Sequence, residues 1–297
     1  MSPAYDDTPA PAGAPAQGEL AGMPRRLMSA SPSRMLTWLD CPRAYRLRYL
    51  DTPRPAPRPQ RAHTTVGTIT HEVLRDFWDL PPAERTPQRV ARLVDAAWHD
   101  TGFRDDAQSA RWRERVRWQV LAYLRSLGEA RSAQPVGTER TVSFTTRALA
   151  FSGRVDRLDE RDGELVIVDY KTGRRPPTQD DARTSLALAL YALGATRVFR
   201  RPCARVELHH VPTGTIAAHE HTEASLQRKA DEADSIVSDL RRAAAAHGDS
   251  GPDAALFAPR LSGLCAWCDV RAHCPEGTAY VPEKSDWAGL PGEEDEA

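Results

Sequence analysis

One short apolar run constrains the fold of this chain more than any other part of its sequence. Leu165-Val166-Ile167-Val168 begins shortly after Gly163 and ends at Asp169-Tyr170-Lys171. A continuous run of branched aliphatic residues after a turn residue is typical of a strand that is buried on both faces. We therefore expect residues 164–171 to form an interior strand of a sheet.

The pattern of apolar residues changes in the middle of the chain. Helical spacing dominates the first part, at 31–39, 42–50, 66–78, 86–98 and 108–131. Later, strands are expected at 138–145, 151–158, 203–211 and 215–220, and helices at 185–198 and 224–245. This order predicts one α/β domain, in which helices flank a mixed central sheet and a helical insertion occupies about 80–131.

The two ends of the chain differ in composition from its body. Residues 1–24 are rich in Ala, Pro and Gly, and residues 282–297 carry six acids, so both are expected to be disordered. Residues 25–281 form the expected domain and have a net charge of +7. A basic body of this kind suits a polyanionic partner such as nucleic acid.

Hydropathy and cysteine content narrow the class of protein. No stretch approaches the ~20 apolar residues of a membrane span, and the N-terminus lacks a signal-peptide pattern. We expect a cytoplasmic protein without a membrane partner, in which thiols stay reduced. Its five cysteines then favour metal binding or burial over disulfides.

Two acids are expected to approach each other across a hairpin. Asp156 ends the sequence Gly-Arg-Val-Asp, and Asp169 follows the apolar run. If the two strands pair antiparallel with Leu158 opposite Leu165, Asp156 lies opposite Ile167. Asp156 is then diagonal to Asp169 on one face of the sheet, within reach of a shared ion.

A divalent cation and Lys171 would make this arrangement chemically useful. Two carboxylates at the end of an apolar strand are costly unless a hard cation such as Mg²⁺ or Mn²⁺ neutralises them. Lys171 is one of only three lysines among 40 basic residues, which favours a specific role for its ammonium group. The alternative is an Asp–Lys ion pair that only ends a strand.

These two motifs carry a family resemblance. Gly-Arg-Val-Asp-Arg-Leu-Asp and Val-Asp-Tyr-Lys-Thr-Gly resemble the RecB-type branch of the PD-(D/E)XK nucleases, and the resemblance covers about 29–281. It implies a restriction-endonuclease-like core and metal-dependent hydrolysis of DNA. It also implies metal ligands at Asp156 and Asp169, a candidate ligand in the Tyr170 backbone carbonyl, and a catalytic Lys171. Val155 stands where the family usually has Pro.

A histidine on an early helix extends the predicted metal site. Gly67 and His71 lie one helical turn apart, and the glycine would leave room for a phosphate backbone. A lone His on such a stripe is usually a core residue. RecB-type nucleases, however, carry Gly-x-x-x-His before the sheet, so the resemblance implies that His71 is a third metal ligand.

Four of the five cysteines form a second candidate site. Cys265, Cys268 and Cys274 cluster near the C-terminus, and Cys41 lies far upstream; Cys203 is expected to be a core residue. Spacing alone leaves a four-thiolate Zn²⁺ site and a [4Fe–4S] cluster open. The AddB-type and CRISPR-adaptation nucleases have the same one-plus-three arrangement, and this resemblance implies a [4Fe–4S] cluster that joins both ends of the domain.

A second position departs from the family pattern. Relatives carry Gln-x-x-x-Tyr after the catalytic lysine, whereas here Ala187 precedes Tyr191. Tyr191 is a candidate DNA contact, as are Arg174 and Arg175, which directly follow the catalytic strand. Glu139, at the start of the first long strand, is expected to support the site without taking part in catalysis.

The leading hypothesis is a DNA exonuclease that acts on single-stranded ends in repair or recombination. A CRISPR spacer-processing nuclease shares the same fold class. Ala187 raises the alternative of a catalytically weak or inactive DNA-binding module, and a zinc protein with an incidental Asp-x-Lys is a third. No helicase motif is present, so ATP-driven unwinding would need a helicase or repair partner.

Overall fold

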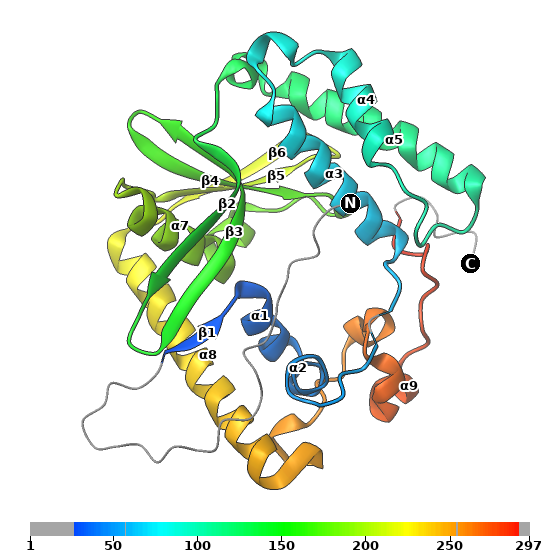
Figure 1. Cartoon of the computed structure of the whole chain (residues 1–297), viewed down its shortest axis with the longest axis vertical. Coiled ribbons are helices and arrows are strands. Elements are labelled where there is room, and N and C mark those ends of the chain that lie inside the picture. Colours follow the sequence, from blue (N-terminus) through cyan, green and yellow to red (C-terminus); the bar gives the residue numbers. More distant parts are fainter. Residues whose placement is uncertain (1–26, 57, 254, 291–297) are drawn as a thin grey trace.

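Figure 1 shows the computed structural model, which describes residues 27–56, 58–253 and 255–290. The segment 1–24, for which we expected disorder, lies outside the described residues. No helix in the described ranges is both long enough and apolar enough to cross a membrane.

The centre of the fold is a six-stranded mixed sheet with the order β1-β3-β4-β5-β6, in which β2 also pairs with β3. The strands β3 and β4 are antiparallel, as are β2 and β3 and also β5 and β6, whereas β1 runs parallel to β3 and β4 runs parallel to β5. The bounds are β1 Met28–Ala30, β2 Gly137–Thr145, β3 Leu149–Arg161, β4 Glu164–Lys171, β5 Arg205–His210 and β6 Thr215–Glu220.

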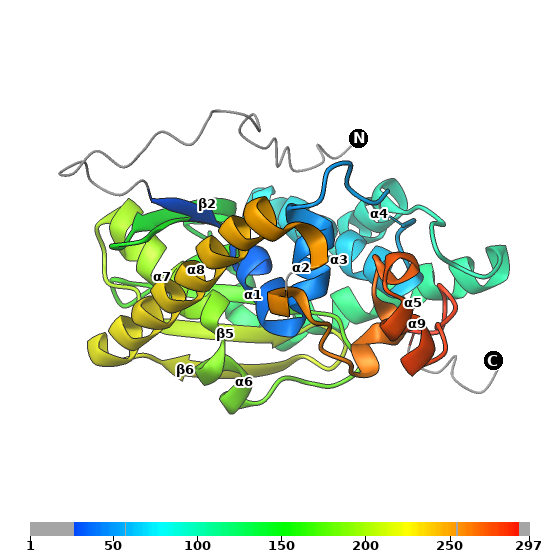
Figure 2. The same cartoon turned by 90° about the horizontal axis from the view of Figure 1, so that it is seen from below.

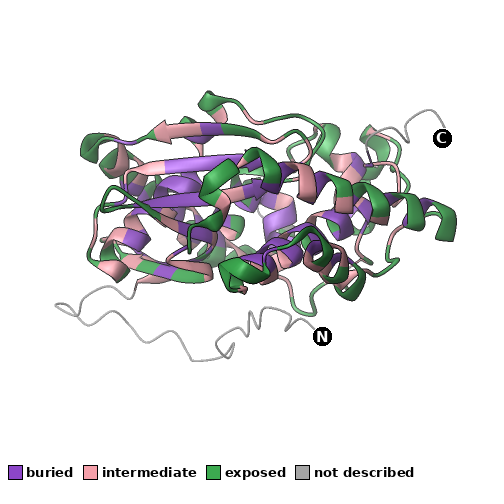
Figure 3. Ribbon diagram, turned by 90° about the horizontal axis from the view of Figure 1, so that it is seen from above, coloured by how far each residue is buried: buried purple, intermediate pink, exposed green. Residues whose placement is uncertain are grey.

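Helices cover both faces of the sheet, so the expected α/β class is confirmed (Figures 1 and 2). One layer contains α1 (Pro32–Asp40), α7 (Leu186–Phe199) and α8 (Glu223–Ser250), and the other contains α3 (Ala62–Asp79), α4 (Pro87–Ala97) and α5 (Asp106–Ser126). Alternate residues of β4 enter these two cores: Leu165 and Ile167 enter the first, and Val166 and Val168 enter the second. The run is buried on both faces, as predicted. Figure 3 shows buried residues concentrated in the central strands.

Smaller elements complete the described chain. They are α2 (Pro42–Tyr49), α6 (Gln179–Thr184), α9 (Pro275–Tyr280), and the 3₁₀ turns η1 (Pro82–Glu84), η2 (Gly128–Ser132), η3 (Gly251–Asp253), η4 (Ala255–Phe257), η5 (Gly263–Trp267) and η6 (Arg271–His273). We did not predict β1 or α6 from the sequence. Helix α2, near the start of the described chain, contacts the C-terminal turns (Figure 1).

The register of the β3–β4 hairpin differs from the one we expected. Leu158 pairs with Ile167 and not with Leu165, and the hairpin closes at Arg161 and Glu164. Asp162 and Gly163 both have positive φ, at 51° and 85°, as a two-residue type I′ turn requires. The turn lies one residue further along the chain than the expected pairing implies, so each residue of β3 faces a residue two positions later in β4.

The C-terminal tail was expected to be disordered from residue 282, but residues 282–290 pack on the start of α3. The Asp286 carbonyl accepts a hydrogen bond from the Ala62 N–H at 3.0 Å. Glu283 forms ion pairs with Arg58 and Arg61. Leu290 is 1% exposed, within the core beneath α3. The tail is ordered there because its acids meet basic partners; residues 291–297 lie outside the described part.

Candidate active site

Asp156 lies where β3 and β4 separate. Their ladder ends at the pair Arg157 and Val168. One residue further along, Asp156 Oδ2 accepts a hydrogen bond from the Tyr170 N–H at 2.8 Å. The carboxylate therefore replaces a backbone partner and holds the two strands together at the point where they diverge.

The sheet is irregular at this level. Val155 and Leu158 both enter the core beneath α7, although strict alternation would send them to opposite faces. Between them, Arg157 lies on the other face, with its guanidinium carbon 4.3 Å from the centre of the Trp78 ring. On the neighbouring strand Glu139 has φ of 47°, which is unfavourable for a residue other than glycine. Such strain concentrates at functional sites.

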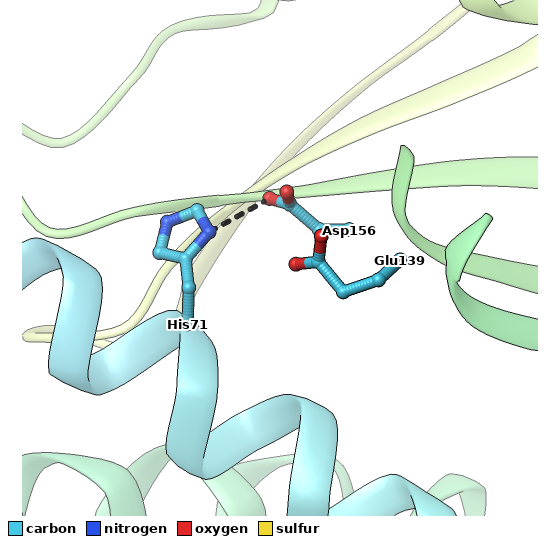
Figure 4. A group of neighbouring side chains, drawn as sticks. All are labelled: His71, Glu139 and Asp156. Atoms are coloured by element: carbon cyan, nitrogen blue, oxygen red, sulfur yellow. Dashed lines mark ion pairs between the residues drawn. The ribbon is translucent and has the colours of Figure 1, made fainter. Parts of the chain in front are cut away.

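His71 reaches this irregularity from α3. Its Nδ1 lies 3.3 Å from Asp156 Oδ2, and Figure 4 shows the imidazole and the Glu139 carboxylate directed toward the same space. Among the described residues, one ligand atom each from His71, Glu139 and Asp156 lie within 4.8 Å of one another. The structure thus adds Glu139, which we expected only to support the site, to the candidate ligands.

Asp169 and Lys171 lie at the end of β4, beside this group. Asp169 Oδ2 is 2.5 Å from the Lys171 ammonium nitrogen, but no donor of the described residues meets it with hydrogen-bond geometry. Asp169 is not part of the three-residue group with ligand atoms within 4.8 Å, because its carboxylate is turned toward Lys171. Lys171 is exposed, so its ammonium group can reach a bound substrate.

Burial and like charge perturb the acids. Burial, together with the Asp156 charge, raises the pKa of both Asp169 and Glu139. Burial would also raise the pKa of Asp156, but the hydrogen bond and charge of His71 outweigh it and lower that pKa. The same contact outweighs burial at His71 and raises the imidazole pKa. The three carboxyl groups lie close together, and their negative charges repel one another. A bound cation would relieve this repulsion.

The loop after β4 forms the wall of the site nearest α3. A Cβ on Gly67 would lie 3.3 Å from Thr172 Oγ1, so the glycine makes room for this loop; we had expected it to admit a phosphate backbone. The His210 ring donates a hydrogen bond from Nε2 to the Gly173 carbonyl at 2.6 Å. His210, which matched no motif in the sequence, therefore anchors the segment that follows Lys171.

The three candidate DNA contacts, Arg174, Arg175 and Tyr191, differ in exposure and in the residues they touch. Arg175 pairs with Asp181 of α6 at 3.1 Å, and Arg174 is exposed beside it. The ring of Tyr191 lies 6.2 Å from that of Phe151. A Cβ on Gly153 would come within 2.5 Å of the Tyr191 ring, so this glycine of β3 leaves space for the tyrosine.

The four predicted cysteine ligands lie in one region of the fold. Cys41 and Cys268 pack against the same small apolar cluster. The sulfurs of Cys274 and Cys265 lie 3.3 and 3.8 Å from the position of a Cβ on Gly277. The Cys274 sulfur accepts a hydrogen bond from the Gly277 N–H at 3.4 Å. All four are free thiols, so no disulfide competes for them.

Arginines tie this region together. Arg43 of α2 pairs with Glu276 of α9 at 3.3 Å, and Arg48 Nε donates to Asp269 at 3.0 Å. The buried Arg271 donates to backbone carbonyls throughout the cysteine segment, including that of Cys265 at 2.9 Å. These contacts join α2 to the C-terminal segment that carries three of the cysteines.

The site thus consists of acids placed where two central strands of a mixed sheet diverge. A family model described as the PD-(D/E)XK nuclease superfamily matches residues 29–275. The chain therefore belongs to the PD-(D/E)XK nuclease superfamily. No curated protein matches its sequence.

Two solved structures align with the chain at low sequence identity. A protein from Eubacterium rectale described as a candidate exonuclease aligns with a TM-score of 0.50 and 11% identity, over 86% of this chain and 89% of that one. The protein SSO0001 aligns with a TM-score of 0.33 and 13% identity, over 85% and 87% of the two chains, a similarity too low to show a shared fold.

Proposed function

We propose that this protein is a Mg²⁺- or Mn²⁺-dependent DNA exonuclease of the RecB type, acting on single-stranded ends in repair or recombination. The observation that carries the proposal is the convergence of His71, Glu139 and Asp156, with ligand atoms within 4.8 Å, beside Asp169 and Lys171. Membership of the nuclease superfamily supports hydrolysis of nucleic acid.

The donor set fits a hard divalent ion. It offers carboxylate oxygens and one imidazole, and Asp169 Oδ2 is buried without a well-oriented donor. His71, Asp156 and Asp169 would hold the ion together with Glu139, and the Tyr170 carbonyl is a further candidate ligand. When bound, the ion supplies Lewis-acid chemistry at a phosphate oxygen.

The protein's own groups would position the reactants. The Tyr170 N–H fixes Asp156, and Asp169 holds the Lys171 ammonium group at the mouth of the site. Lys171 would orient the attacking water and stabilise the charge that develops on the phosphate oxygens. Water adds to phosphorus as the bond to the leaving oxygen breaks, with no covalent enzyme intermediate.

We further propose that Cys41, Cys265, Cys268 and Cys274 hold a [4Fe–4S] cluster. An N–H hydrogen bond to the Cys274 sulfur is a feature that tunes such clusters. Zinc held by the same four thiolates is the alternative.

The test compares end-labelled linear single-stranded DNA with internally labelled circular single-stranded DNA in the presence of Mn²⁺, before and after addition of EDTA. We expect the wild type to degrade linear DNA and spare circles. Lys171→Ala should lose about 100-fold or more in rate. Lys229→Ala on α8, where the lysine pairs with Glu232 at 2.9 Å, is the matched control and should keep the rate. Equal digestion by Lys171→Ala, or digestion that survives EDTA, would contradict the proposal.

Ala187 favours one second candidate, a nuclease-derived module that binds DNA without cutting it, since the usual glutamine amide is missing. Such a module would bind single-stranded ends, but the wild type would leave them intact in the digestion assay with every divalent ion. Unwinding of duplex substrate by either candidate would depend on a helicase partner.

A further inference from the structure

A second hollow lies beside the candidate active site. Its volume is about 440 Å³, and it is lined by Ser29–Arg34, Ser152–Arg154 and Tyr191; we call it the serine pocket. Ligand pockets typically measure about 300–1,000 Å³. Arg154 also lines the hollow that contains His71 and Glu139, so this arginine borders both spaces.

The pattern of strand pairing explains why the pocket is open. One edge of β3 pairs with β2 along most of its length. The other edge pairs with β1 at Leu149–Phe151 and with β4 only from Arg157 onward. The described ladders therefore give residues 152–156 no strand partner on this edge. The serine pocket occupies one end of the gap, and Asp156 occupies the other.

The lining of the serine pocket suits an anion. None of its ten lining residues is acidic, although the chain contains 41 Asp and Glu residues. Four are serines and two are arginines. Hydroxyl groups and the Arg34 guanidinium are donors that bind phosphate oxygens. Arg154 pairs with Glu139 at 3.1 Å, a residue outside the lining of the pocket.

Arg34 is held in place by neutral partners. Its Nε donates to the Tyr45 hydroxyl at 3.3 Å, and its guanidinium carbon lies 5.2 Å from the centre of the Tyr49 ring. Tyr45 is fully buried, which fixes the position of the arginine. No carboxylate of the described residues pairs with Arg34, so its charge is available to a ligand.

From these observations we propose that the serine pocket binds a phosphate group of the DNA strand next to the scissile phosphodiester. The proposal rests on the nuclease function proposed above and adds a substrate subsite to it. The strand would pass from the acids at Asp156, along Arg154, to the hydroxyls and Arg34. The phosphate is either an internal one or a terminal one, and the choice determines how the enzyme engages an end.

The test measures equilibrium binding of fluorescent 12-nucleotide single strands to the full chain in EDTA, where hydrolysis does not occur. Ser152→Asp places a negative charge in the pocket at an exposed position, and Arg34→Gln removes the guanidinium group. Each should weaken binding about tenfold. Ser235→Asp on α8 and Arg92→Gln on α4 make the same charge changes at exposed positions outside the pocket, and should stay within about twofold of wild type.

Strands with a 5′-phosphate, a 3′-phosphate or two hydroxyl ends distinguish the sources of the phosphate. A terminal site gives the wild type a preference for one phosphorylated end, which Ser152→Asp removes. An internal site gives equal losses for all three strands. Pocket variants that melt like the wild type and bind like their controls would overturn the proposal, as would a wild type that binds no strand.

The result of this binding test can be distinguished from the result of the hydrolysis test of the nuclease proposal. Binding in EDTA does not depend on the metal site, whereas the comparison of Lys171→Ala with wild type depends on hydrolysis. Loss of the Lys171 effect with retention of the pocket effect would reject the nuclease function alone. The reverse result would reject only the phosphate subsite.

Discussion

His71 Nδ1 lies 3.3 Å from Asp156 Oδ2, which joins helix α3 to the strand that carries the first acid. The rest of α3 packs into the same core as β4 through residues such as Ile69 and Val73. The imidazole is therefore fixed by the packing of a whole helix layer. A ligand held in this way loses little freedom when an ion binds, which favours affinity.

The cysteine region makes a prediction about iron. Cys41→Ser removes one of the four proposed ligands, so anaerobically purified protein should lose most of its iron and its visible absorption. Its melting temperature should also fall, because the cluster would close a loop of more than 200 residues between Cys41 and Cys265. Cys203→Ala is the control: this buried thiol lies outside the cluster region and should leave iron content unchanged. Zinc in place of iron in the wild type would contradict the cluster.

A buried charge network beneath β4 should contribute strongly to stability. Arg157 is 2% exposed, pairs with Asp159 at 2.9 Å and donates to the Tyr170 hydroxyl at 3.1 Å. Arg157→Ala removes one of the two arginines that pair with Asp159, since Arg161 remains at 3.2 Å, and it removes the donor to the Tyr170 hydroxyl. It should lower the free energy of unfolding by about 1–3 kcal/mol. Urea denaturation measures the change.

The control for this network is Arg201→Ala. Arg201 pairs with Glu160 at the surface, where solvent screens the interaction, so little change is expected. Equal effects of the Arg157 and Arg201 substitutions would show that the network adds nothing beyond a surface ion pair.

His221 should make stability depend on pH. Burial, with the nearby charges of His219 and Lys229, lowers its pKa to about 4. The unfolded chain takes up a proton near the ordinary pKa of about 6.5, so folding is disfavoured progressively as pH falls from about 6.5 to about 4. His221→Asn retains an amide donor for Ser225 and cannot titrate there. The difference in melting temperature between wild type and variant should shrink as pH falls over this range; a constant difference would contradict the assignment.

Much of the fold was predictable because buried helices and strands have regular patterns of apolar residues in the sequence. The apolar run of β4 and the period of α3 specify elements whose faces are set by hydrophobic packing. The structure placed β4 at the expected residues 164–171 and β6 at 215–220. Three-residue β1 carries no comparable pattern, and its pairing with β3 depends on contacts that are distant in sequence.

The errors have local physical causes. The expected register placed the turn one residue too early; it lies at Asp162-Gly163, where both φ angles are positive, and the pairing differs by two residues. Because side chains alternate with a period of two, the shift preserves the face of each residue. Acidic composition suggested a disordered tail, but Glu283 and Asp286 find Arg58 and Arg61 in the folded chain. Composition does not specify such partners.

In the candidate site, too, some residues were predictable from the sequence and others were not. Asp156, Asp169 and Lys171 stood out through motifs, and His71 through its spacing from Gly67. Glu139 was expected only to support the site, and the folded sheet, with φ of 47° at this residue, brings it to His71 and Asp156.

The central claim is that these side chains bind a divalent ion, and Mn²⁺ binding measured by electron paramagnetic resonance tests it most directly. The wild type should bind Mn²⁺ at one tight site. Asp156→Asn, which keeps the size of the side chain, should weaken that site by about tenfold or more, whereas Lys171→Ala should retain it. Equal Mn²⁺ affinity of the wild type and Asp156→Asn would contradict the account.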